Sequence, residues 1–322
     1  MALSDMKVFN EYFMPAIIET LKQQVQKFNE ASHGSIILST DGFTGDFLQE
    51  SFFASLHSAQ RRTNRYATND DAPITDLTQK KQSSVKIAGG FGPIKYEPSE
   101  LTWLEKPTAE GIEVISRNFA EAIMADQLNT AILALSGAIS NQPDATNDVT
   151  ATSGISYAAM NDAHALFGDH SGNLIAQIMT GTTFHRLIGQ NIKNTENLFR
   201  AQNINVVDVL GKAVVVTDAP ALYEQGQVKK IKVLSLAENA AIVHDGKDII
   251  TNIETTNGKQ RIETTIQMDY TFGLGLKGYS WDEGNGGKSP SDEKIGTGAN
   301  WNRIVSSIKA TAGVITIADA SK

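Results

Sequence analysis

The stretch of sequence that decides the fold is one long amphipathic segment, Thr108–Asn141, TAEGIEVISRNFAEAIMADQLNTAILALSGAISN. Thr108 is placed to cap its first turn, and Asn141-Gln142-Pro143 ends it. At about 1.5 Å per residue such a helix is roughly 50 Å long. A strut of this length favours a structural protein, although a long core helix of an enzyme has the same composition. Its apolar residues recur at steps of three to five, mostly three or four, as on one face of an α-helix: Ile112, Ile115, Phe119, Ile123, Leu128, Ile132, Leu135 and Ile139.

The apolar stripe predicts which substitutions the helix tolerates. Leu128 lies in the middle of the stripe, so Leu128→Asp is expected to place a carboxylate in the core and to give insoluble or unassembled protein. Gln127 lies one residue away and off the stripe, and the same change there is expected to be nearly silent.

Composition and charge limit the class of protein. The 322 residues, 41% hydrophobic and 20% charged, suffice for one large or two ordinary globular domains. No run of about 18 apolar residues predicts a membrane span, and Asp5, Lys7 and Glu11 interrupt a signal-peptide core. The absence of cysteine excludes disulfides and thiolate chemistry and fits a reducing cytoplasm. The net charge of −8 opposes nucleic-acid binding. Three basic clusters are therefore interpreted as solvated or subunit-contact charges rather than phosphate sites: Arg61-Arg62-Arg65, Lys80-Lys81 and Lys229-Lys230-Lys232.

Two arms are expected before the long helix. Val8–Phe28 has apolar residues at helical spacing, and such a terminal helix packs on its own domain or, as we favour, on another subunit. Ser35–Phe53 predicts short extended pieces, and Gln60–Ser84 is too polar to bury itself. Strand-like residues flank a turn predicted at Gly89-Gly90-Phe91-Gly92-Pro93, so Gln60–Tyr96 is predicted to be a two-stranded arm that neighbouring subunits support.

A polar break at Gln142–Gly154 precedes an α/β pattern over residues 153–246. Helices are predicted over Ser156–Phe167 and Thr182–Ile192, the second capped by Thr182 or Thr183. Strands are predicted over Asn173–Thr180, Val206–Leu210, Ala213–Thr217, Lys229–Leu236 and Ala240–His244.

The strongest hairpin pattern follows this region. Asp248–Thr256 and Lys259–Tyr270 flank Asn257-Gly258, which favours the positive φ angles of a type I′ turn. Apolar and polar residues alternate from Ile262 to Asp269, so one face of this strand is predicted to be buried and the other wet. Gly284–Gly298 is predicted to be a loop.

One glycine motif suggests a nucleotide site. Gly273-Leu274-Gly275-Leu276-Lys277-Gly278 matches G-x-G-x-x-G and follows a predicted strand. The motif needs a helix whose N-terminus receives the pyrophosphate, but Tyr279–Gly286 has no helical period. We therefore interpret these glycines as places where a strand bends or another backbone approaches. Gly287-Lys288-Ser289 matches a phosphate loop less well, because Asp282 stands where the first glycine is needed.

No constellation of catalytic or metal-binding residues stands out. There is no G-x-S-x-G elbow and no distinctive pair of carboxylates. We predict no catalytic residue, no cofactor and no metal site. The six histidines lack the spacing that puts two ring nitrogens on one metal: His33, His57, His164, His170, His185 and His244.

Several short stretches, together with the order of the predicted elements, are similar to one known family. The stretches are Val8-Phe9-Asn10-Glu11, Phe28-Asn29-Glu30-Ala31-Ser32, Leu276-Lys277-Gly278-Tyr279-Ser280-Trp281, Ser289-Pro290-Ser291-Asp292 and Asn300-Trp301. They resemble the major capsid proteins of tailed bacteriophages, which have the Hong Kong 97 type fold. The resemblance implies an α+β fold with an N-terminal arm (1–34), a peripheral domain (35–59, 97–152 and 247–322) with a spine helix (108–141), an extended β-hairpin loop (60–96) and an axial domain (153–246).

The resemblance also implies a function. The chain would be a non-enzymatic subunit that forms hexamers and pentamers and closes an icosahedral shell around double-stranded DNA. The implied partners are other copies of the chain, a scaffolding protein, a portal protein and, in some shells, a decoration protein. The acidic balance fits weak, non-specific contact with packaged DNA. The implied location is the virion capsid, assembled in the host bacterial cytoplasm. The alternatives are an encapsulin-like shell and a nucleotide-dependent enzyme that uses Gly273–Gly278.

Some members of that family crosslink a lysine of the extended loop to an asparagine of a neighbour. Lys80, Lys81, Lys86 and Lys95 lie in or near this region, but no spacing selects one of them, and we predict no crosslink. No long charged propeptide precedes the first predicted helix, so we expect no fused scaffolding segment.

Overall fold

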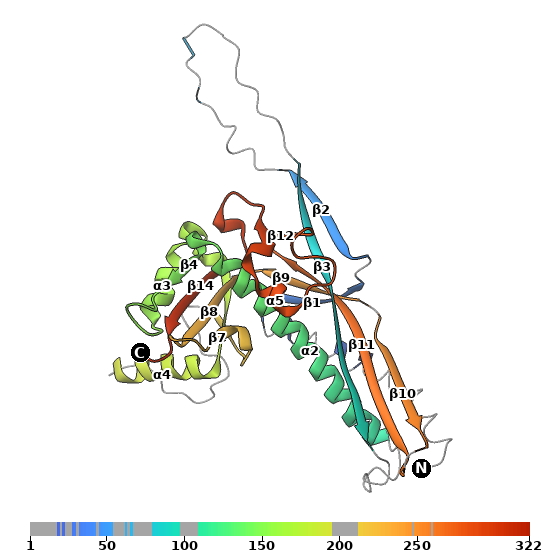
Figure 1. The fold of residues 1–322 in the computed structure, drawn as a ribbon. Helices are drawn as coiled ribbons and strands as arrows, with labels where there is room; N and C mark the ends of the chain where they lie inside the picture. Colours follow the sequence, from blue (N-terminus) through green and yellow to red (C-terminus); the bar gives the residue numbers. More distant parts are fainter. Residues whose placement is uncertain are drawn as a thin grey trace.

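The central element of the fold is one long helix, α2 (Ala109–Ser140) (Figure 1). The predicted helix is confirmed to within one residue at each end. Its segment Arg117–Ser140 has the length and apolarity of a membrane span, but 56% of its most apolar stretch is buried within the chain, as in the core helix of a globular protein. The computed structural model describes residues 18–19, 21–22, 28–29, 32–42, 45–53, 62, 65–66, 79–96, 109–194, 212–246, 248–258 and 260–322.

The first sheet is organised around one long strand, β11. One edge of β11 pairs antiparallel with β3, from Leu274↔Val85 to Thr264↔Tyr96, and its other edge pairs with β10 and β9 in turn. β3, β10 and β11 run beside α2 toward its N-terminal end and form a three-stranded arm (Figure 1). The sheet has the order β1-β9-β11-β3-β2, with β10 also on β11. Its strands are β1 (Ile36–Gly42), β2 (Phe47–Phe53), β3 (Gln79–Tyr96), β9 (Ala241–Asp245), β10 (Ile250–Thr256) and β11 (Glu263–Leu276).

The second sheet lies on the other side of α2. Ile231 and Val233 of β8 face the core under the helices α3 (Tyr157–Ala165) and α4 (Gly181–Asn194), whereas Leu234 and Leu236 face the core around α2. This alternation explains why one strand sequence can bury both of its faces. The sheet has the order β4-β14-β8-β5-β6, with β7 also on β8. Its strands are β4 (Thr146–Asp148), β5 (Leu174–Met179), β6 (Ala213–Val216), β7 (Tyr223–Glu224), β8 (Lys230–Ala237) and β14 (Gly313–Asp319).

Short elements pack against the C-terminal end of α2. The predicted loop Gly284–Gly298 contains a short helix, α5 (Asp292–Gly296), whose Ile295 is fully buried. Trp301 donates its Nε1–H to the Ile295 carbonyl (2.9 Å) and packs edge-on against Trp281, with ring centroids 4.8 Å apart. These two tryptophans belong to a two-stranded unit of β12 (Tyr279–Trp281) and β13 (Trp301–Arg303). The 3-10 turns are η3 (Pro143–Ala145), η4 (Gly168–Asn173), η5 (Pro220–Leu222), η6 (Gly298–Asn300) and η7 (Ile308–Ala310).

The predicted turn at Gly89–Pro93 is wrong, because β3 runs straight through it. The glycines instead allow close pairing with β11: a Cβ on Gly89 would lie 2.8 Å from the Tyr270 ring. A bulge in β3 opposite Ile266 and Met268 accommodates Pro93. Residues 79–96 of the predicted extended loop therefore belong to the first sheet. Of residues 60–78, only positions 62, 65 and 66 are described.

The boundaries predicted for the inserted domain, 153–246, also need correction. Two strands of the second sheet, β4 and β14, come from outside that range, and β9 belongs to the first sheet. The cap predicted at Thr182 or Thr183 is wrong, because the hydroxyl of Thr180 accepts the Thr183 N–H (3.3 Å). The strand predicted at Val206–Leu210 lies outside the described residues.

The hairpin of β10 and β11 is confirmed, but the two-residue turn at its tip is wrong. Thr256 pairs with Glu263, so residues 257–262 form the connection. The alternation is confirmed in the strand, where Met268 is buried and Gln267 and Asp269 are exposed, whereas Ile262 lies in the connection and is 55% exposed.

The N-terminal helix is described only at residues 18, 19, 21, 22, 28 and 29, all of which are helical. Leu21 is 7% exposed and packs in the core of its own chain. At this residue the helix therefore packs on its own domain and not, as we favoured, on another subunit.

The apolar stripe of α2 is confirmed where its residues are described, but its width is underestimated. Gln127, predicted to lie off the stripe, is only 5% exposed, so the prediction that Gln127→Asp is silent loses its basis. Both sheets and α5 pack against the helix, and from residue 130 onward most of its side chains are buried. Small residues there are as buried as the large ones: Ala131, Ala134 and Ala138.

Candidate assembly surfaces

The three-stranded arm is fastened to α2 by an aromatic and polar contact. The Tyr270 hydroxyl on β11 donates to the Asp126 carboxylate on α2 (2.6 Å), and Phe91 of β3 stacks on Tyr270 at 5.6 Å. Phe91 also packs edge-on against Phe119 of α2. Burial raises the pKa of the Asp126 carboxyl despite this hydrogen bond, and the Asp292 carboxylate adds to the rise. The arm thus packs along one face of α2, and these contacts hold the two together.

The lysines near the predicted extended loop all bond within their own chain. Lys80 donates to the Ile304 carbonyl (2.6 Å), Lys81 to Glu283 (2.8 Å) and Lys86 to Asp248 (3.1 Å), and Lys95 pairs with Glu263. These bonds anchor the strands from which the loop leaves. They do not select one lysine for a crosslink, and the predicted absence of a crosslink stays a prediction.

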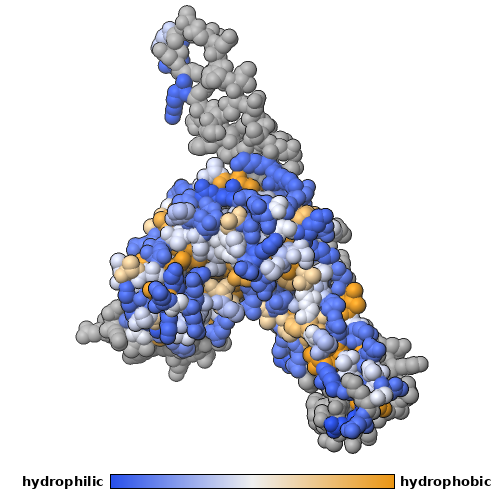
Figure 2. Space-filling model, in the orientation of Figure 1, coloured by the Kyte–Doolittle hydropathy of each residue, from blue (hydrophilic) through white to orange (hydrophobic). Residues whose placement is uncertain are grey.

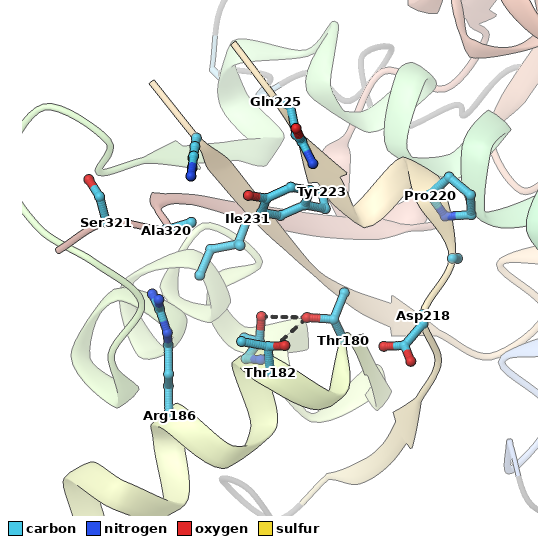
Figure 3. A pocket seen from close by; sticks show the side chains of 13 residues that line it. Thr180, Thr182, Arg186, Asp218, Pro220, Tyr223, Gln225, Ile231, Ala320 and Ser321 are labelled. Carbon is cyan, nitrogen blue, oxygen red and sulfur yellow. Dashed lines mark hydrogen bonds between the residues drawn. The ribbon is translucent and has the colours of Figure 1, made fainter. Parts of the chain in front are cut away.

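A hollow of about 770 Å³ lies at one end of the second sheet (Figure 3). Thr180 and Thr183 share a hydrogen bond (2.9 Å) at the start of α4, and Asp218 accepts the Gly181 N–H (3.4 Å). Arg186 and Lys229 supply positive charge at its rim. Among the described residues that line it there is no histidine and no pair of facing carboxylates. The hollow therefore provides polar contacts rather than acid–base chemistry.

A serine and a histidine meet inside the second sheet. His164 of α3 is 6% exposed, and its Nε2 lies 2.9 Å from the Ser235 hydroxyl of β8 and 3.4 Å from the Gln177 amide of β5. Burial lowers the pKa of His164, and the Lys212 cation lowers it further. The pair has the chemistry of a nucleophile and a base. It is nevertheless enclosed between α3 and the sheet, where it acts as a polar tie in the core.

His164 makes stability depend on pH. Because its pKa is lower in the folded chain than in the unfolded one, the unfolded chain binds the proton first. The contribution of His164 to the free energy of unfolding is therefore complete above the unfolded pKa of about 6.5, and it declines as the pH falls below that value. We expect the urea midpoint to fall more steeply from pH 7.5 to 5.5 in the native chain than in His164→Gln. His185→Gln, on the exposed side of α4, is the matched control. Parallel curves for the native chain and His164→Gln would contradict this assignment.

The glycine motif serves packing. Gly273 and Gly275 lie within β11, and Gly278 (φ 80°) forms the turn into the strand β12. A Cβ on Gly275 would lie 2.6 Å from the Ser84 hydroxyl, and one on Gly278 would lie 3.0 Å from the Ala310 carbonyl. A strand follows where a nucleotide site needs a helix, and the interpretation as close backbone approach is confirmed at Gly278. Gly287 accepts the Trp281 indole N–H (3.0 Å), and Lys288 pairs with Asp46 (3.5 Å).

The visible surface is mostly hydrophilic, with apolar side chains in small separate patches (Figure 2). Among the described residues no three histidine, aspartate or glutamate side chains come together as a metal site. The features that stand out are a long helix between two sheets, an arm fastened beside it and a hairpin base whose lysines bond within the chain.

This mixed helix and sheet fold is similar to the Hong Kong 97-like fold of solved phage capsids. The capsid asymmetric unit of Cyanophage Pam1 is 13% identical, with 88% of each chain covered and a TM-score of 0.51. A structure from Mycobacterium phage Cain is 11% identical, with 88% of this chain and 89% of that chain covered and a TM-score of 0.54. The acidic stable capsid of Helicobacter pylori bacteriophage KHP30 is 11% identical, with 88% and 87% covered and a TM-score of 0.50. At these identities the likeness shows the fold.

The family is shown by the sequence as well. The chain belongs to the major capsid protein 13-like family, whose model matches residues 5–315. Among curated proteins none matches the chain. The chain is thus a structural subunit of a phage capsid and occurs as an oligomer in the virion shell, as the resemblance implied. The encapsulin-like and nucleotide-dependent alternatives are not favoured.

Proposed function

We propose that copies of this chain form hexamers and pentamers, and that these close an icosahedral shell around double-stranded DNA. The observation that carries the proposal is the shape of the subunit. The β2–β3 hairpin base and the three-stranded arm project from opposite ends of a body that α2 braces (Figure 1). Each projection reaches past the compact part of the subunit that the structure describes, and so offers a surface to a neighbouring subunit.

The domain roles follow from this arrangement. We assign the second sheet with α3 and α4 to the axial domain, which meets its copies around the capsomer axis. The first sheet and α2 form the peripheral domain, and the β2–β3 hairpin leads into the extended loop. A net charge of −8 supports a shell that holds DNA by weak, non-specific contact. The remaining proposed partners are a scaffolding protein, a portal protein and, in some shells, a decoration protein, with assembly in the host bacterial cytoplasm.

Electron microscopy of the purified chain tests the proposal directly. Closed shells, rings or tubes built from six- and five-membered units are the expected result. A monomer or dimer at every concentration and in the presence of scaffolding protein would contradict it.

Removing the tip of the extended loop is expected to separate folding from assembly. Residues 57–75 are replaced by a short Gly-Ser linker, which leaves β2 and β3 whole. The deleted segment carries few large apolar residues, so its loss costs the monomer little core. We expect an unchanged circular dichroism spectrum and a loss of shells in electron micrographs.

The control for this deletion is Gly172→Ala in the turn η4, where an added Cβ has no neighbour within 4 Å. It is expected to assemble normally. Normal shells from the tip deletion would show that the loop only decorates the surface.

A further inference from the structure

We infer that Glu283 is a positioning residue for assembly: its carboxylate fixes the base of the β2–β3 hairpin on the body of the subunit and so sets the angle at which the extended loop leaves. This inference rests on the proposed function, because the angle matters only if the loop reaches a neighbour.

The first ground is that one carboxylate oxygen collects three donors from both strands of the hairpin. Glu283 Oε1 accepts from Ser83 Oγ (2.7 Å), Lys81 Nζ (2.8 Å) and Gln49 Nε2 (3.0 Å). Gln49 pairs with Ser83 across the ladder, and Lys81 lies two residues along, so the three donors share one face of the hairpin. The Lys81 ammonium and the Ser83 hydroxyl hold the pKa of Glu283 below its usual range. An ionised carboxylate can only accept, so it suits three donors at once.

The second ground is that the turn carrying Glu283 is itself held rigidly. Asp282 accepts the backbone N–H groups of Gly284 (3.0 Å) and Asn285 (3.1 Å), and its other oxygen accepts from the Asn285 amide (2.9 Å). On the other side of the turn, Trp281 is buried against Trp301 and donates to the Gly287 carbonyl. The turn therefore holds the backbone of Glu283 in place independently of the hairpin.

The third ground is that the first sheet supports the hairpin only as far as Val85, and Glu283 contacts the hairpin just beyond that residue. The ladder between β3 and β11 ends at Val85↔Leu274, so residues 79–84 pair only with β2 among the described strands. A two-stranded ribbon is marginal without further support. Besides Glu283, the support comes from Ser280, whose hydroxyl accepts the Ser83 N–H (2.9 Å), and from the carbonyls that Gln82 and Lys80 reach. Glu283 is the member of this set that joins both strands.

The test measures the orientation of the hairpin. The chain has no cysteine, so spin labels can be placed at will. One label replaces Leu48 of β2, which alternates with Gln49 along the strand and so lies on the opposite face of the hairpin, and the other replaces the exposed Ala125 of α2. In the unassembled full chain, Glu283→Ala is expected to broaden the label-to-label distance distribution roughly twofold, because the ribbon loses its joint support. Glu293→Ala, an exposed carboxylate of α5, is the matched control and is expected to leave the distribution narrow.

The second readout is the shell. Glu283→Ala is expected to give shells of mixed size, tubes or open sheets under conditions where the native chain gives one size. An unchanged distance distribution would overturn the inference, and so would a broadened one that still yields uniform shells. If Glu283→Ala fails to fold, Lys81→Gln combined with Ser83→Ala removes two of the three donors and tests the same contact from the hairpin side. If the native chain itself forms no shells, the proposed function fails, whereas the distance measurement still decides the role of Glu283.

Discussion

Gly137→Val is expected to yield little or no soluble native subunit. A Cβ at Gly137 would lie 2.3 Å from the carbonyl oxygen and 2.9 Å from the carbonyl carbon of Gly296, and both are backbone atoms that cannot rotate away. From the other side, a Cβ on Gly298 would lie 2.3 Å from the Gly137 carbonyl oxygen. The helix α2 and the α5–η6 segment thus touch backbone to backbone. A valine would push α5 outward and withdraw the buried Ile295 from the core.

The size of the effect follows from the stability margin. Overpacking a well-packed site costs about 1–3 kcal/mol and occasionally more, and displacing Ile295 adds a loss on the scale of about 2–5 kcal/mol for removing a core aliphatic side chain. A domain is stable by only about 5–15 kcal/mol. The soluble fraction and the urea midpoint are the measurements. The control is Gly189→Ala in α4, where a Cβ has no neighbour within 4 Å and alanine is expected to be neutral or stabilising by up to about 1 kcal/mol. Native-like stability of Gly137→Val would mean that α5 is not fixed on α2.

Much of the fold could be predicted from local pattern, and the failures have one cause. The period of α2 is visible because large apolar residues mark one face, but the period does not show how many neighbours surround a helix. Alanine, serine and glycine are uninformative about burial in sequence, and in α2 they are what lets α5 and both sheets approach. Gly137 looks like a weak helix residue and is in fact a contact point.

The strands show the same limit at longer range. The glycines at 89, 90 and 92 are typical of a turn, and only the pairing partner β11, far along the chain, shows that they lie in a continuous strand. Likewise β14 completes the second sheet from the C-terminal end of the chain. Pairing across such distances leaves no mark in a local window, whereas β5, β8 and β9 are each marked within the window by a short stretch rich in apolar residues.

The candidate assembly residues were the least predictable part. Glu283 stands in a Gly- and Asp-rich loop and looks like an ordinary surface acid, and its donors lie about two hundred residues away. The nearest pattern in the sequence is Lys81 and Ser83 at alternate positions, which places two donors on one face of a strand. That pattern indicates a polar face but not its partner.

Ile132→Asp is expected to lower the yield of soluble native subunit as much as Gly137→Val does, for an electrostatic reason. Ile132 is fully buried in the core around α2, so the new carboxylate either stays charged at a cost of several kcal/mol or takes up a proton. Burial raises its folded pKa, so the destabilisation is smallest at low pH and grows as the pH rises through that raised value. Leu128→Asp is expected to do less, because Leu128 is only partly buried. Gln127 is buried and cannot serve as the control. Ala125 is exposed on the same helix, and aspartate there is expected to change the urea midpoint little. Urea unfolding at pH 5 and pH 8 decides the matter, since equal midpoints for Ile132→Asp and Ala125→Asp would show that the helix does not bury this face.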